Sequence, residues 1–117
     1  MVQNIPPTHN FTYDGAEIRV YHANKGEGLP KHKHGFAHAT MCNAGSCLVS
    51  LEGRNYTINK DSQPLNLPAA EWHEIEALED GTVFVNVFAE GKYYCLLLIG
   101  YLTNLATCKR LICRLVR

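Results

Sequence analysis

The chain has 117 residues, and its 11 lysines and arginines are balanced by 11 aspartates and glutamates. That length predicts a single domain, large enough to bury a core without disulfides. The net charge is zero with neutral histidines, and neither a basic stripe nor an acidic tail is present, so the composition argues against a nucleic-acid partner.

Five cysteines are present, at irregular spacing. An odd, irregular set predicts no disulfide framework, and the absence of a CxxC pair argues against a structural zinc site. The start of the chain lacks the charged and apolar regions of a signal peptide. We therefore expect a reducing, cytoplasmic setting.

Short β-forming runs separated by turn residues occupy most of the chain. Regular short strands of this kind predict an all-β antiparallel sandwich or barrel. We expect a leader at 1–14, a β-barrel domain at 15–91 and a separate apolar segment at 92–117. Strands are predicted at Glu17–Ala23, Phe36–Asn43, Ser46–Glu52, Asn55–Asn59, Leu65–Leu67, Trp72–Leu78 and Thr82–Ala89, with Asn24–Lys33 as a Gly/Pro loop.

The segment 92–117 is Leu-rich and has apolar residues at helical spacing, which predicts a C-terminal helix packed on the domain or on a partner. A membrane anchor is one alternative, and a poorly packed extension is another. The apolar run Tyr93–Cys108 is about 16 residues, however, against the roughly 20 that a bilayer span needs, and Asn104 interrupts it.

Four histidines carry the strongest chemical signal. His32, His34 and His38 are separated by even numbers of positions, which on a strand places their side chains on one face. His73 follows on a later predicted strand. Converging imidazoles form a site for a divalent transition metal, whereas a His-x-His pair alone is common on surface strands.

The spacing of these residues resembles the two signature motifs of the cupin superfamily. Gly26, His32, His34 and Gly45 match the first motif, and Pro68 and His73 match the second. The resemblance covers roughly residues 15–90. It implies a small antiparallel β-barrel, or jelly roll, whose mouth holds one metal ion bound by His32, His34, His38 and His73.

Two positions depart from the family pattern. His38 stands where the family usually has glutamate, and Ala70 stands where it usually has glycine. A fourth neutral imidazole would make the metal complex more cationic, its bound water more acidic and its hold on anions stronger. A ligand set made only of imidazoles also suits iron, nickel, zinc or copper rather than magnesium or calcium. Because alanine does not readily adopt φ > 0, we expect a slightly altered turn before His73.

Strand parity also predicts a pocket and an interface. Phe36 and Thr40 share parity with His34 and His38, and we expect them to line the cavity together with Asn86 and Tyr21. His22 shares a face with Ile18 and Val20, so we expect it in the core or cavity, whereas Trp72 should point outward. Valines alternate with Phe84, Asn86 and Phe88, so both faces of that strand are apolar, which predicts a covered outer face and a homodimer.

Three functions fit this constellation. The first is an enzyme acting on a small organic molecule, either dioxygenase-like or a Lewis-acid lyase or isomerase. The second is a non-catalytic module that binds a small ligand, which is favoured by the lack of a well-placed acid–base residue. The third is a structural metal clip. A fold of this kind does not by itself choose among them.

Overall fold

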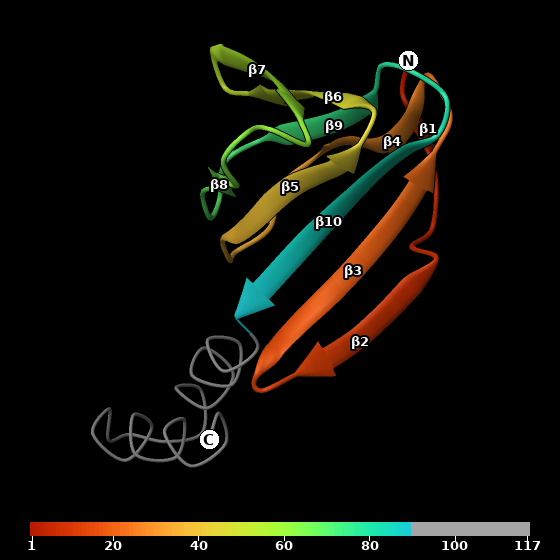
Figure 1. Cartoon of the computed structure of the whole chain (residues 1–117). Coiled ribbons are helices and arrows are strands. Elements are labelled where there is room, and N and C mark those ends of the chain that lie inside the picture. Colours follow the sequence, from red (N-terminus) through yellow and green to blue (C-terminus); the bar gives the residue numbers. More distant parts are fainter. Residues whose placement is uncertain (90–117) are drawn as a thin grey trace, which may run out of the picture.

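The computed structural model describes residues 1–89, and within them the chain forms two five-stranded sheets (Figure 1). The first sheet has the order β1-β4-β9-β6-β7, and the second has the order β2-β3-β10-β5-β8. All described pairings are antiparallel except β1 with β4. The strands are β1 Gln3–Asn4, β2 His9–Tyr13, β3 Ala16–Ala23, β4 Glu27–His32, β5 His38–Ala44, β6 Ser46–Leu51, β7 Arg54–Asn59, β8 Leu65–Leu67, β9 His73–Ala77 and β10 Thr82–Ala89.

The core lies between the two sheets and is built from alternate residues of their inner faces. On β10, Phe84, Asn86 and Phe88 are buried and face inward. Phe84 stacks on Tyr21 of β3, with ring centroids 4.7 Å apart. From the other sheet, Val49 and Ile75 are fully buried. Burying each such side chain contributes about 1.5–3 kcal/mol, so this core holds the two sheets together.

Two glycines permit the close approach of neighbouring strands. A side chain at Gly28 would collide with the backbone carbonyl of Ile75 on β9, and one at Gly45 would collide with Thr82. Gly45 also has a φ of +70°, which an L-residue rarely adopts. Gly28 lies within β4 and Gly45 lies in the turn between β5 and β6, and glycine at each position allows the close approach.

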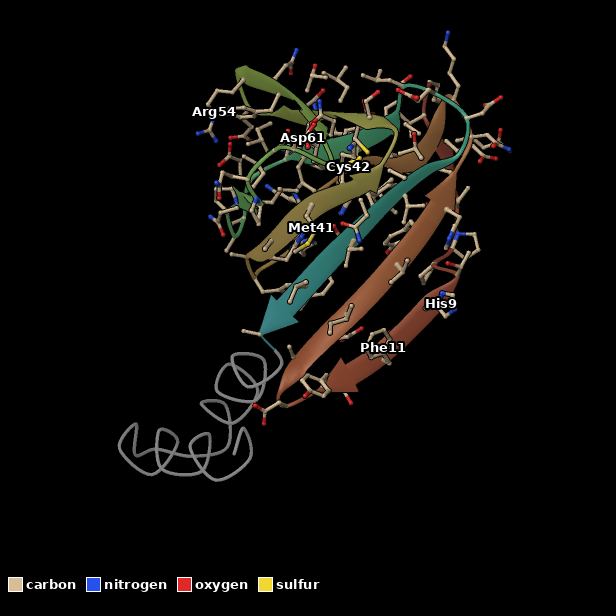
Figure 2. The ribbon with its side chains drawn as sticks, viewed as in Figure 1. His9, Phe11, Met41, Cys42, Arg54 and Asp61 are labelled. Carbon is tan, nitrogen blue, oxygen red and sulfur yellow. The ribbon has the colours of Figure 1, made fainter. Side chains whose placement is uncertain are left out.

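The outer face of the second sheet is also apolar. On β10, Val85 pairs with Val20 of β3 and with Met41 of β5. Ile18 of β3 pairs with Phe11 of the edge strand β2, and the Phe11 side chain is 49% exposed. Figure 2 shows Phe11 and Met41 on this sheet. The predicted alternation along Thr82–Ala89 is therefore confirmed, with Phe84, Asn86 and Phe88 inside.

Several local predictions differ from the structure. The expected loop at 24–33 contains strand β4, and Pro30 lies within it near a break in the register with β9. Proline cannot donate to a ladder, which explains why this stretch reads as a loop. The predicted strand at 36–43 begins only at His38. Residues 1–14, which we set apart as a leader, contribute β1 and β2 to the sheets.

The prediction that His22 lies in the core or the cavity was wrong. Its side chain is exposed, while Tyr21 and Ala23 on the opposite face of β3 are buried. The apolar face of Ile18 and Val20, which His22 shares, is the outer face of the sheet, so the hydrophobic pattern alone pointed to the wrong side. Trp72, predicted to point outward, is 38% exposed.

The predicted C-terminal segment at 92–117 lies outside the described residues, so its helix stays a prediction. In residues 1–89 there is no helix with the length and apolar character required to span a bilayer.

Candidate metal centre

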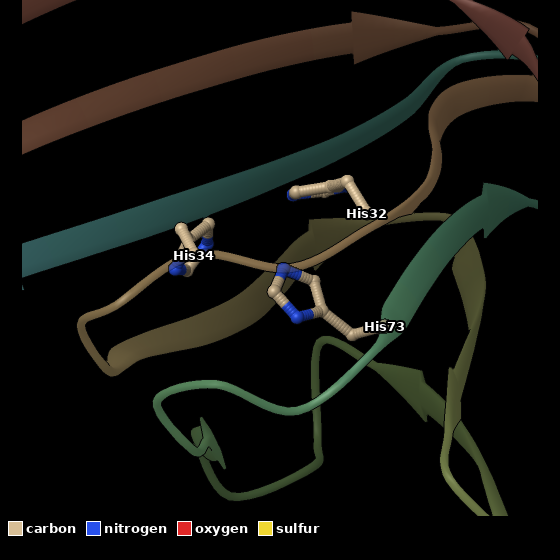
Figure 3. A group of neighbouring side chains, drawn as sticks. All are labelled: His32, His34 and His73. Atoms are coloured by element: carbon tan, nitrogen blue, oxygen red, sulfur yellow. The ribbon is translucent and has the colours of Figure 1, made fainter.

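Three histidine side chains converge between the two sheets (Figure 3). His32 is the last residue of β4, His34 lies in the loop that follows, and His73 is the first residue of β9. One ring nitrogen from each lies within 4.8 Å of the others. The pairing of His32 with His73 across β4 and β9 brings the two sequence motifs together.

Each of the three rings is held by a backbone carbonyl. The Nδ1 atoms of His32, His34 and His73 lie 2.6, 2.7 and 3.0 Å from the carbonyl oxygens of Pro30, Phe36 and Glu71. A carbonyl can only accept, so each Nδ1 carries the hydrogen and each Nε2 keeps a free lone pair. This arrangement orients imidazoles for metal ligation.

The Nε2 atom of His73 is the one buried side-chain polar atom without a hydrogen-bond partner in residues 1–89. The His73 side chain is 1% exposed. Leaving a buried acceptor unpaired costs about 1–3 kcal/mol. A metal ion among the three Nε2 atoms would satisfy it, so the donor set fits a divalent transition metal.

The environment of His34 and His73 favours the neutral form of their imidazoles. Burial lowers the pKa of His73 to about 4, and the neighbouring His32 and His34 contribute in the same direction. Burial, chiefly, also lowers the pKa of His34. Neutral imidazole is the form that binds a metal, so the rings of His34 and His73 need lose no proton to do so at neutral pH.

His38 lies beside this group but not within it. Its ring centroid is 5.3 Å from those of both His34 and His73, and its side chain is 4% exposed. Burial, followed by the nearby His73 and His34, lowers its pKa to about 3. We expected four ligands, His32, His34, His38 and His73. The structure brings three of them together, and His38 lies next to that group.

The tautomer of His38 is set by two buried polar side chains. The Thr40 hydroxyl donates to Oδ1 of Asn86 over 2.6 Å. Having used its one hydrogen, it accepts from Nδ1 of His38 at 3.2 Å. His38 thus carries its hydrogen on Nδ1 and keeps a lone pair on Nε2. Thr40 is fully buried and acts by holding His38 and Asn86.

A cavity of about 180 Å³ opens beside the histidines. Of the residues predicted to line it, Phe36, Asn86 and Tyr21 do, together with His32, His34 and His38. Phe36 stacks on His34 with ring centroids 4.0 Å apart. Sequence reasoning missed three lining residues, namely Arg19, Leu29 and Phe88. Arg19 and Phe88 could have been predicted, because they lie on the same strand faces as Tyr21 and Asn86, respectively.

Comparison with known proteins gives a consistent result at the level of structure. No protein-family model and no curated protein matches the chain. Among solved structures, a cupin 2 domain-containing protein from Halorhodospira halophila aligns with a TM-score of 0.62 at 16% identity, over 70% of this chain and 62% of that one. A cupin protein from Bacteroides fragilis aligns with a TM-score of 0.55 at 20% identity, over 64% and 65%.

The chain has the cupin fold. KdgF from Halomonas sp. has a similar structure as well, with a TM-score of 0.53 at 17% identity over 68% of this chain and 83% of that one. The fold implied by the two motifs is thereby confirmed. These identities are low enough that the likeness extends to the fold alone.

Of the two departures from the cupin motifs, Ala70 behaves differently from our expectation. It adopts φ > 0 after all, at +58°, and its backbone N–H donates to the carbonyl oxygen of His34 over 2.7 Å. The left-handed conformation is kept because this hydrogen bond joins the loop before His73 to the loop that carries His34.

Proposed function

We propose that this cupin binds one divalent transition metal through Nε2 of His32, His34 and His73, and acts as an enzyme on a small organic molecule in the adjoining cavity. The observation that carries the proposal is the buried, unpartnered Nε2 of His73 beside two further oriented imidazoles. Three ligands are also the usual number in catalytic sites, which keep a coordination position for substrate.

The ligand type favours iron, nickel, zinc or copper. When bound, such an ion supplies Lewis-acid polarisation for a lyase or isomerase reaction or, in the case of iron, dioxygenase-like chemistry. We propose the oxygenase and the Lewis-acid forms as the two versions to be tested.

The chain's own residues supply position and environment. Phe36 and Phe88, whose ring centroids are 5.5 Å apart, form an aromatic wall that limits water near the histidines. His38 lines the same cavity as a neutral ring with a lone pair on Nε2. It can therefore accept a hydrogen bond from a substrate hydroxyl or a bound water.

One observation favours a second function, non-catalytic capture of a small ligand. The residues that line the cavity include no aspartate or glutamate. A carboxylate is a common general acid or base, and His38 with a pKa of about 3 is a weak base at neutral pH. Binding without turnover would be the signature of this alternative.

Metal analysis of three purified proteins tests the metal centre. The wild type should hold about one metal ion per chain, and His73→Ala should lose it. His9→Ala, which removes an exposed histidine on β2, should keep it. Equal metal contents in His73→Ala and His9→Ala would contradict the proposed site.

Activity is tested after anaerobic reconstitution with each of the four metals. Oxygen uptake or product formation with small diketones, thiols or acids supports the enzyme. Calorimetric binding without product for the same compounds supports ligand capture instead.

We also propose a reducing, cytoplasmic location. Cys42 and Cys47 support it, because both are buried free thiols although their sulfur atoms are 4.0 Å apart. Mass spectrometry of protein taken directly from the source cell should find both thiols reduced.

A further inference from the structure

We propose that Arg19 anchors the carboxylate of a small organic anion whose other end reaches the metal held by His32, His34 and His73. This inference rests on the proposed function and names its substrate class. Arg19 is the one lysine or arginine among the residues that line the histidine cavity.

The position of Arg19 follows from the strand register. On β3 it shares the inner face with Tyr21, which is buried, and it pairs with Asn86 of β10. Asn86 in turn pairs with Thr40 of β5. A row of polar side chains therefore crosses the inner face of the sheet at the level of the cavity, with the arginine at one end.

The Arg19 guanidinium is held in place with donors to spare. Its Nε donates to a carboxylate oxygen of Glu17 over 2.7 Å, and its central carbon lies 4.8 Å from the centroid of Phe88. The ion pair, a hydrogen bond with the Tyr21 side chain and the aromatic face restrict the Arg19 side chain. Because a guanidinium has five N–H donors in a planar fork, donors remain for a carboxylate.

A second donor faces the same space. Oδ1 of Asn86 accepts from Thr40, so its NH₂ group is the part of the amide left for a ligand. Asn86 and Arg19 both line the cavity. Two donors on one wall and a metal among imidazoles on the other form a clamp for a molecule with an oxygen at each end.

Charge and size favour an anion with few atoms. Imidazole ligands carry no negative charge, so they leave the charge of a divalent ion uncompensated, and the lining residues include no carboxylate. The metal end of the cavity thus attracts negative charge. At the other end Arg19, although paired with Glu17, still offers N–H donors to a carboxylate. A volume of about 180 Å³ is that of roughly six water molecules, which suits a short organic acid.

Calorimetry on the metal-loaded protein tests the inference with matched probes. Glycolate and oxalate are the carboxylates, glycolamide is the neutral counterpart of glycolate, and inorganic phosphate tests other oxyanions. We expect Arg19→Gln to weaken glycolate and oxalate binding about 10- to 100-fold while leaving glycolamide binding unchanged. The carboxylate affinity of Arg19→Lys should lie between those of the wild type and Arg19→Gln, because lysine keeps the charge but lacks the planar fork of N–H donors.

Lys60→Gln is the charge-matched control, since Lys60 is exposed on the turn after β7. It should bind both carboxylates as the wild type does. The double variant Glu17→Gln/Arg19→Gln removes the ion pair without leaving Glu17 unpaired, and it should show the same carboxylate loss.

The two proposals fail differently. A metal-loaded Arg19→Gln protein that binds glycolate as tightly as the wild type would overturn the role of Arg19 and leave the metal centre standing. The role is also overturned if neither carboxylate binds the metal-loaded wild type, or if only phosphate does. A wild type that takes up no metal would instead refute the proposed function.

Discussion

The backbone N–H of Ala70 donates to the carbonyl oxygen of His34, and Ala70 adopts a φ of +58° to do so. This single hydrogen bond links the segment before His73 to the loop between β4 and β5. It joins the two parts of the chain that supply the candidate metal ligands, at a position where an L-residue is strained.

Replacing Ala70 with glycine should therefore stabilise the protein. The left-handed conformation costs an alanine about 1–2 kcal/mol, and glycine gives back part of the gain through unfolded-state entropy. We expect a net increase of up to about 1 kcal/mol in the free energy of unfolding, measured by urea denaturation of the metal-free protein.

Ala69→Gly provides the matched control, because Ala69 is an exposed neighbour without positive φ. It should leave stability unchanged or lower it by less than about 1 kcal/mol. If Ala70→Gly is less stable than the wild type, the strain at this position has been misjudged.

The metal-free protein should lose stability as the pH falls below about 6.5. The folded-state pKa values of His38 and His73 are lowered to about 3 and about 4, so the fold favours their neutral forms. The unfolded chain takes up protons below its pKa of about 6.5, which pulls the equilibrium toward unfolding. The loss approaches about 1.4 kcal/mol per pH unit for each histidine until the folded-state pKa is reached.

Urea denaturation in the presence of a chelator, at several pH values between 7 and 4, measures this slope. His38→Gln removes one of the histidines whose pKa the fold lowers, so the slope of stability against pH should fall by about one proton. An unchanged slope in this variant would show that His38 does not contribute.

The hydrogen bond from Thr40 should control the tautomer of His38. Thr40→Val keeps the shape of the side chain but leaves Oδ1 of Asn86 and the Nδ1 hydrogen of His38 without their buried partner. We expect about 1–3 kcal/mol of destabilisation and a mixture of His38 tautomers in ¹⁵N NMR spectra. Thr57→Val, on the exposed face of β7, should change neither quantity. A single unchanged tautomer in Thr40→Val would refute this role.

The apolar outer face of the second sheet should form the interface of a homodimer. Val87 lies on this face between Ile18 and Ala39 of the neighbouring strands. A contiguous apolar surface of this kind is typical of an interface, and one patch that pairs with its own copy gives a two-fold dimer. Light scattering should give the dimer mass for the wild type and the monomer mass for Val87→Lys.

Thr57→Lys adds the same charge to an exposed position on β7, in the other sheet, and should leave the dimer intact. A monomeric wild type would contradict the prediction.

Sequence reasoning succeeded where short-range patterns control the structure. Alternation along Thr82–Ala89 predicted which side chains share a face, because successive side chains on a strand point to opposite faces. The convergence of His32 and His34 with His73 was also predicted, although on the assumption that His32 and His34 lie on one face of the same strand. In the structure these two histidines lie at a strand end and in a loop, and the carbonyls of Pro30 and Phe36 orient them.

By itself, the sequence determined the all-β fold, the two histidine motifs and their order, since spacing along the chain is enough to specify each. Only the tertiary structure decided that His38 stands outside the group of three, that Arg19 reaches the cavity and that His22 does not. The physical reason is that strand pairing between distant segments chooses which apolar face becomes the interior. Backbone carbonyls brought close by that pairing then choose which nitrogen of each ring is left to bind.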